Sequence, residues 1–227
     1  FVQVGSQVWT KCLHDAVRKC GENGLLVDIH DEYRPTGVSR TYPNLMTQEG
    51  IRGNEEYPDA AQNAILPFTR YVAGAADYTI CYYRQDWDRL KGDVYGPAKK
   101  KSIQNTPTHQ LSLLIVYYSP LQVIFWYDKP SDAMDEPELK LFNDVFTVWD
   151  ETHVLEGVPG EVASIARLHG EEWFVGSIIG TDPRNVNIDL SFLKSGVSYL
   201  AEIYTDGGDL IPTRTHVAVN HQTVINK

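Results

Sequence analysis

The pattern of the chain changes near residue 147, and this change limits what the chain can fold into. Before it, helical spacing alternates with a short apolar run and a long irregular stretch. After it, short β-rich runs follow one another between turns that contain Gly and Asp. We therefore predict two domains, a mixed α/β region at residues 1–146 and an all-β domain at residues 147–227.

The first region begins with one helix and one strand. Apolar residues return at helical spacing from Gln7 to Cys20, behind a Ser6 that suits the N-cap position. A Gly-rich turn then leads into the run 25–29, which is apolar enough for a strand buried on both faces, as in parallel sheets covered by helices. Further helices are predicted at 63–73, 107–118 and 137–146.

The second region contains five short runs of β type, at 162–168, 172–179, 185–190, 199–205 and 216–219. Strands at this spacing are typical of a sandwich or a closed sheet. We expect a small antiparallel β-sandwich.

The stretch from 30 to 61 shows no sustained period and follows the predicted strand. A loop of this length inside a compact domain is usually functional or disordered, and its charged and aromatic residues favour function. Carboxylates gather around it: Asp28, Asp31, Glu32, Glu49, Glu55, Glu56 and Asp59. Two carboxylates are the minimum for glycoside hydrolysis, and three or more oxygen ligands can hold Ca²⁺.

Two other functions remain open on these residues. His30 and Asp31, with His109 as a distant third ligand, are compatible with a metal-dependent hydrolase, although no H-x-x-x-H pattern is present. A carbohydrate-binding protein without turnover is the other alternative.

Charge and hydropathy exclude two classes of partner. The formal net charge of -10 leaves no basic face for phosphate backbones, so we expect no nucleic acid. The most apolar stretch, 113–127, is shorter than a bilayer requires and contains Ser119, Pro120 and Gln122, so we expect no membrane span.

Three motifs in and after the long loop carry a resemblance: YRPTG at 33–37, RTYPNL at 40–45 and EGIRGNE at 49–55. With these segments, and with further likeness at 63–70, 73–79, 108–111 and 148–152, the chain resembles glycoside hydrolase family 97. This family comprises calcium-dependent bacterial α-glucosidases and α-galactosidases.

The resemblance implies a fold and a partner. Residues 1–146 would be the C-terminal part of a (β/α)8 TIM barrel, and 147–227 the small antiparallel β-sandwich domain that follows it. The N-terminal half of the same enzyme would lie upstream of Phe1, as would a signal for a periplasmic or secreted location.

The resemblance also implies residue roles in an exo-acting hydrolase that removes terminal α-linked glucose or galactose from oligosaccharides. Glu55, in the R-G-x-E segment, would be the general acid, and Glu49 a Ca²⁺ ligand. Asp31 would act as a base and, with Glu55, as a further metal ligand. His30, Arg34 and His109 would hydrogen-bond the sugar.

Two departures from the family leave the anomeric outcome open. Inverting members carry a glutamate where this chain has Asp31, which is followed by Glu32. Retaining members carry a small residue there and use an aspartate at the end of the preceding strand, just before Phe1. The sequence matches neither pattern fully.

Overall fold

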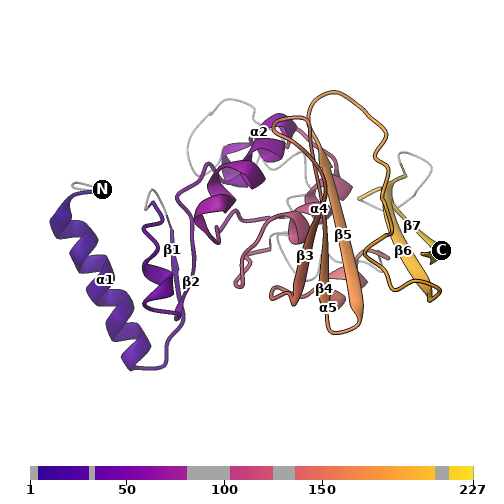
Figure 1. Cartoon of the computed structure of the whole chain (residues 1–227). Coiled ribbons are helices and arrows are strands. Elements are labelled where there is room, and N and C mark those ends of the chain that lie inside the picture. The colour runs from indigo at the N-terminus through magenta and orange to yellow at the C-terminus, as the bar shows by residue number, and fades with distance from the viewer. Residues whose placement is uncertain (1–4, 31–33, 81–102, 125–135, 208–214, 227) are drawn as a thin grey trace.

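The computed structural model describes residues 5–30, 34–80, 103–124, 136–207 and 215–226. Within them the chain is a mixed α/β structure in which a parallel strand pair precedes two antiparallel sheets. Figure 1 shows α1 with this pair at one end of the molecule, helices α2 and α4 in the middle, and the strands of the C-terminal region beyond them.

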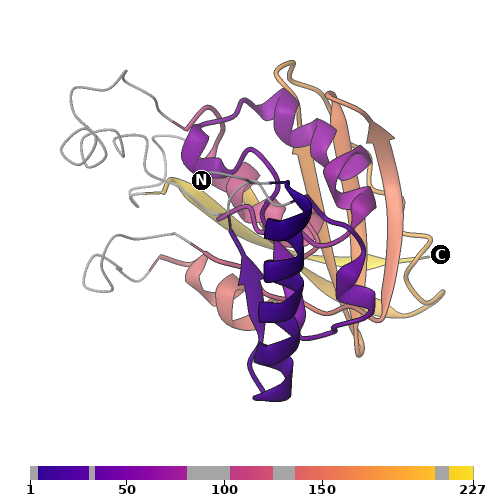
Figure 2. The same cartoon turned by 90° about the vertical axis from the view of Figure 1, so that its left-hand side faces the viewer.

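Helix α1 spans Gln7–Glu22 and confirms the predicted N-terminal helix. The Ser6 hydroxyl accepts a hydrogen bond from the Trp9 amide at 3.2 Å, which satisfies one of the first backbone donors of the helix. Val17 is buried and packs with Ile29 and Leu45 in a small apolar cluster. Figures 1 and 2 show α1 alongside the strands that supply those two residues.

Strands β1 (Val27–Ile29) and β2 (Leu45–Gln48) pair in parallel. The prediction of a strand buried on both faces from residue 25 is wrong for its first part, because Leu25 and Leu26 are 57% and 66% exposed and precede the strand. β2 lies inside the predicted loop. A strand of four residues is too short to give a periodic signal, and only its neighbour β1 defines it.

The predicted helices form with shifted bounds. α2 (Ala60–Ile65) continues as two 3₁₀ turns, Leu66–Phe68 and Arg70–Ala73, because Pro67 cannot supply the amide that a longer α-helix needs. Helix α4 spans Pro107–Val116, and α5 spans Leu139–Asp144. Short 3₁₀ turns also form at Val38–Arg40 and Asn54–Glu56.

The C-terminal region contains two antiparallel sheets. Strands β3 (Glu151–Val158), β4 (Val162–His169) and β5 (Glu172–Ile179) are ordered β3-β4-β5, while β6 (Ser198–Asp206) pairs with β7 (Val217–Ile225). The predicted strand at 185–190 is absent, since alternation there meets no neighbouring strand. β3 was missed because its side chains are mostly exposed and give no apolar pattern.

Helix α4 lies at the centre of the main core and packs against β4, β5 and β6. Leu113 and Leu114 are fully buried against this sheet layer, in one cluster with Ala163 and Ile178. At Gly176 of β5 a Cβ would lie 2.8 Å from the Ser112 carbonyl oxygen, so the strand approaches the helix more closely than any side chain would allow.

A buried arginine joins the same two elements. Arg167 of β4 donates to the Ile115 carbonyl at 2.5 Å and to the Val116 carbonyl at 3.3 Å, which satisfies two acceptors at the C-terminal end of α4. The core therefore continues across residues 146 and 147, and the domain boundary there stays a prediction. Among the described residues no helix has the length and apolar character of a membrane span.

Candidate active site

The parallel pairing of β1 and β2 brings their carboxyl ends to one edge, where polar side chains meet. The Glu49 amide donates to the Ile29 carbonyl at 2.7 Å, and the Asp77 amide donates to the Gln48 carbonyl at 3.2 Å. The ends of β1 and β2 and the segment at Asp77 therefore lie side by side, although they are distant in sequence. In barrels of parallel strands this edge is where active sites are built.

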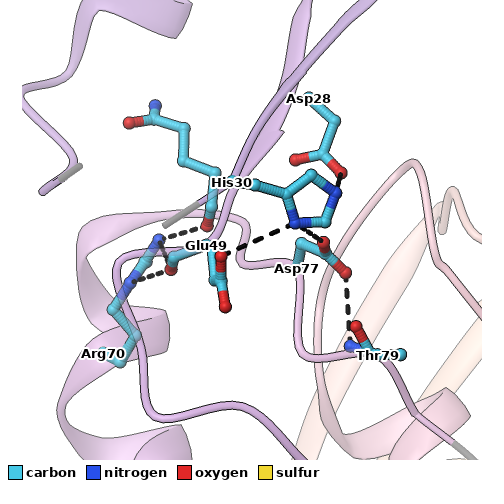
Figure 3. Close-up of polar contacts among 7 residues, drawn as sticks. Asp28, His30, Glu49, Arg70, Asp77 and Thr79 are labelled. Carbon is cyan, nitrogen blue, oxygen red and sulfur yellow. Dashed lines mark hydrogen bonds and ion pairs between the residues drawn. The ribbon is translucent and has the colours of Figure 1, made fainter. Parts of the chain in front are cut away.

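His30 stands at the centre of these segment ends, as Figure 3 shows. Its Nε2 lies 3.4 Å from Asp28 Oδ2, and its Nδ1 lies 3.2 Å from Asp77 Oδ2 and 3.5 Å from Glu49 Oε2. We call Asp28, His30, Glu49 and Asp77 the carboxylate group. The Asp77 side chain is 1% exposed whereas that of His30 is 59% exposed, so the group is buried on one side and open on the other.

The carboxylate group has unusual electrostatics. Burial, followed by the negative charge of Asp77, raises the pKa of Asp28 to about 7. Burial of the His30 ring opposes its protonation, but the charges of Asp28, Asp77 and Glu49 together outweigh burial and raise its pKa. Like charges crowded in a partly buried site disfavour full ionisation, and a bound cation would relieve them. Asp28, His30 and Asp77 each offer one donor atom within 4.8 Å of the others, a separation that a metal ion can bridge.

Arg70 holds the backbone around this group. Its guanidinium donates to the Gln48 carbonyl at 2.8 Å, to the Gly50 carbonyl at 3.2 Å and to the Ala75 carbonyl at 3.2 Å. The turn that carries Glu49 is thereby tied to the segment that leads to Asp77. Burial lowers the pKa of Arg70, but the side chain stays charged because an arginine pKa starts far above neutrality.

Glu55 lies in the short turn Asn54–Glu56, next to the same segment. The Asn54 amide donates to the Tyr78 carbonyl at 3.1 Å. This bond places the turn beside Tyr78, the residue that follows Asp77. Burial raises the pKa of the Tyr78 phenol, and the negative charge of Glu55 is the second cause. Glu55 and Tyr78 are therefore neighbours.

A neutral network of side chains lies behind this turn. Asn54 and Gln110 join their amides through bonds of 2.8 Å and 3.3 Å. Asn63 lies 3.0 Å from His109 Nε2 through its amide nitrogen and accepts from the Tyr78 hydroxyl. We call Asn54, Asn63, Gln110 and His109 the amide network. Burial lowers the pKa of His109 to about 4, so its ring is neutral at physiological pH.

The structure brings together some of the predicted site residues and separates others. His30 and Glu49 meet in the carboxylate group, and Glu55 lies in the adjoining turn. His109 belongs to the amide network rather than to the described metal-capable group, and Arg34 is exposed and outside both. Asp31 lies outside the described residues.

The sequence does not reveal the roles of Asp77 and Arg70, and it gives Asp28 no specific role. Asp28 interrupts an apolar run, and Asp77 follows Ala75 and Ala76 directly. A lone acid inside an apolar segment was the available signal, because such a residue is rarely buried without a purpose.

Two family profiles match the chain. The one described as "Glycoside hydrolase 97" matches residues 1–51, and the one described as "Glycosyl-hydrolase 97 C-terminal, oligomerisation" matches residues 148–227. A retaining alpha-galactosidase of Bacteroides thetaiotaomicron is 35% identical over 215 residues, which cover 91% of this chain and 32% of the relative. A probable retaining alpha-galactosidase of Streptomyces bingchenggensis is 32% identical over 211 residues, which cover 92% and 31%.

Solved structures agree. A glycoside hydrolase family 97 enzyme from Pseudoalteromonas sp. strain K8, in complex with panose, superposes with a TM-score of 0.76 at 26% identity, over 92% of this chain and 33% of that one. A beta-arabinopyranosidase, at 21% identity and a TM-score of 0.74 over 94% and 33%, shares the fold. The chain spans about a third of the length of these relatives. By its sequence and by its structure, the chain belongs to glycoside hydrolase family 97.

Proposed function

We propose that this chain is the C-terminal part of a (β/α)8 catalytic barrel and the all-β domain after it, in an enzyme that removes terminal α-linked galactose from oligosaccharides with retention of configuration. Both curated relatives are retaining or probable retaining alpha-galactosidases. The parallel pairing of β1 with β2, and a further parallel bridge between Ile80 and Ile124, support the barrel. The domains divide at residues 146 and 147.

The observation that carries the proposal is the carboxylate group at the carboxyl edge of β1 and β2, with Glu55 in the next turn. Glu55 protonates the glycosidic oxygen as the bond to the anomeric carbon breaks, and the departing alcohol takes that proton. A carboxylate outside this chain forms the covalent glycosyl intermediate. The ionised Glu55 then removes a proton from water, whose oxygen attacks the anomeric carbon and releases the sugar.

The residues at this edge fit Ca²⁺, which binds oxygen ligands. Asp28 Oδ1 is buried and makes no hydrogen bond within the described part of the chain, and the pKa of Asp28 is raised first by burial and then by the negative charge of Asp77. Glu49 would hold the ion, with Asp31 and Glu55 as further ligands. When bound, the ion would supply positive charge that keeps Asp28 and Glu49 ionised, and it would orient the sugar.

The remaining predicted residues divide by exposure. His30 lies on the open side of the carboxylate group and would exchange a carboxylate partner for a sugar hydroxyl. The exposed Arg34 would also hydrogen-bond the sugar. His109 holds the scaffold, because its Nε2 is already engaged by Asn63. We propose a periplasmic or secreted location, as the family resemblance implies.

An α-glucoside is the second candidate substrate. The observation in its favour is that family 97 enzymes from Pseudoalteromonas were solved in complex with panose and with acarbose. Their identity to this chain is 26%, against 35% for the Bacteroides galactosidase, so galactose remains the first proposal.

The test follows the first-formed sugar by proton NMR. The full-length enzyme that carries this chain is given 4-nitrophenyl α-galactoside or α-glucoside with Ca²⁺, beside the variants Glu55→Gln and Glu56→Gln. We expect α-galactose to form first, Glu55→Gln to lose at least about 100-fold in kcat, and the control Glu56→Gln to keep its activity. β-Galactose as the first product would contradict retention.

The same assay separates the alternatives. Chelation followed by Ca²⁺ or Zn²⁺ should restore activity with Ca²⁺ alone; recovery with Zn²⁺ alone would favour the metal-dependent hydrolase built on His30, Asp31 and His109. Sugar binding without turnover of either substrate would favour the non-catalytic carbohydrate-binding protein.

A further inference from the structure

Gly53 directly precedes the turn of Glu55 in a conformation that does not require glycine. Its φ of -72° and ψ of 175° are extended backbone that any residue adopts. Nothing in the backbone therefore explains why this position lacks a side chain.

The space around Gly53 does explain it. A Cβ built on this residue would lie 2.6 Å from Glu55 Oε1 and 2.8 Å from Glu55 Cδ, and the second carboxylate oxygen is closer still. The carboxylate thus folds back over the Cα of Gly53 and fills the volume that a methyl group would take. An alanine and the present carboxylate position exclude each other.

The backbone of this turn cannot move to make room. The Asn54 amide is bonded to the Tyr78 carbonyl at 3.1 Å, and the Asn54 side chain is 1% exposed and joined to Gln110. The amides of Glu56 and Tyr57 close the turn onto the carbonyls of Gly53 and Asn54. The part that yields is the flexible end of Glu55 itself.

We propose that Gly53 is a positioning residue for the Glu55 carboxylate: the missing side chain sets where the acid proton is delivered. This inference rests on the proposed role of Glu55. A misplacement of about 1 Å in a catalytic group can cost about 100-fold in rate. Gly53→Ala should therefore displace the Glu55 carboxylate while the enzyme stays correctly folded.

The experiment compares leaving groups in the full-length enzyme. The sugar that leaves from melibiose is a poor leaving group and needs protonation. The fluoride ion of α-galactosyl fluoride leaves with little help from an acid. We expect Gly53→Ala to lower kcat/KM, which reports the steps up to cleavage of the first bond, about 100-fold on melibiose and about 10-fold or less on the fluoride. The KM for melibiose should stay within about 3-fold, and the thermal midpoint within about 3 °C, of the parent.

A double variant separates an effect through Glu55 from general damage. Adding Gly53→Ala to Glu55→Gln should cause no further loss on melibiose, because the group being displaced no longer donates a proton. An equal loss of kcat/KM on both substrates, a further loss in the double variant or a large fall in thermal midpoint would overturn the positioning role. If Glu55→Gln stops hydrolysis and Gly53→Ala does not, this inference alone fails; if Glu55→Gln keeps full activity on melibiose, the proposed function fails as well.

Discussion

The carboxylate group and the amide network both adjoin residues 77 and 78, through Asp77 and Tyr78 respectively. Their polar atoms are accommodated in opposite ways. In the amide network neutral side chains pair with one another, as in the joined amides of Asn54 and Gln110. In the carboxylate group three acids surround one imidazole, and Asp28 keeps a buried oxygen without a hydrogen bond in the described structure. Satisfied amides hold a scaffold, whereas crowded like charges cost stability and are kept for chemistry.

The largest effect, and the strongest test of this comparison, is expected when Glu49 is replaced. If the carboxylate group serves catalysis, Glu49→Gln in the full-length enzyme lowers kcat/KM on an α-galactoside by about 100-fold and raises the Ca²⁺ concentration needed for half activity. Its unfolding free energy should stay close to that of the parent. The control Glu22→Gln changes an exposed acid on α1 and should alter neither property. Unchanged activity in Glu49→Gln would remove the functional half of the comparison.

The scaffold half is tested at Asn54. Asn54→Ala leaves the buried Gln110 amide without this partner, and we expect it to lower the unfolding free energy by about 2 kcal/mol in urea titrations. The double variant Asn54→Ala with Gln110→Leu should lose less than the two single variants added together, because both members of the pair are then gone. Strictly additive losses would mean that the two amides do not act as a pair.

The pH dependence of stability at Asp28 gives a further test of like-charge crowding in the carboxylate group. Its pKa is raised to about 7 in the folded chain from an ordinary 3.8, so the folded state holds its proton more tightly than the unfolded state does. Stability from this group is therefore full below pH 3.8 and is lost as the pH rises through 7.

Without Ca²⁺, Asp28→Asn should accordingly gain about 1 kcal/mol in unfolding free energy at pH 8 relative to the parent, and much less at pH 4. Added Ca²⁺ should reduce the difference. Urea titrations at both pH values measure it, and a gain that is the same at pH 4 and pH 8 would speak against like-charge crowding.

An effect of similar size and opposite sign is expected at His109. Its pKa is lowered from 6.5 to about 4, so the unfolded chain binds the proton more readily than the folded chain. The stabilisation is complete above pH 6.5 and is lost as the pH falls towards 4. Compared with His109→Gln, which does not titrate, the parent should lose about 1 kcal/mol over this interval. Parallel pH profiles for the two proteins would refute the buried neutral histidine.

The elements that the sequence predicted well are those with local signals. Helices α1 and α4 each have a hydroxyl N-cap, Ser6 and Thr106, and both formed where the pattern placed them. Strands β2 and β3 have no such signal, because a strand is defined by a neighbour that is distant in sequence. The false strand at 185–190 is the converse case, with alternation but no neighbour.

The candidate site divides in the same way. Glu49 and Glu55 lie in the EGIRGNE motif, and His30 follows the predicted strand directly, so all three could be named from the sequence. Asp31 could be named too and stays a prediction. Asp77 joins them only because its amide pairs with the carbonyl of Gln48, and Arg70 matters through the carbonyls that it binds. Contacts of the backbone depend on the fold rather than on residue type, so no motif could reveal them.

The exposed apolar residues beside β1 bear on how this chain can be prepared. Leu25 and Leu26 are more than half exposed, and within the described residues β1 has a paired neighbour on one side only. A strand with a bare edge next to exposed leucines offers a template for another copy of itself. Expressed alone, the chain should therefore lose soluble monomer as its concentration rises, whereas the full-length enzyme proposed above should stay in solution.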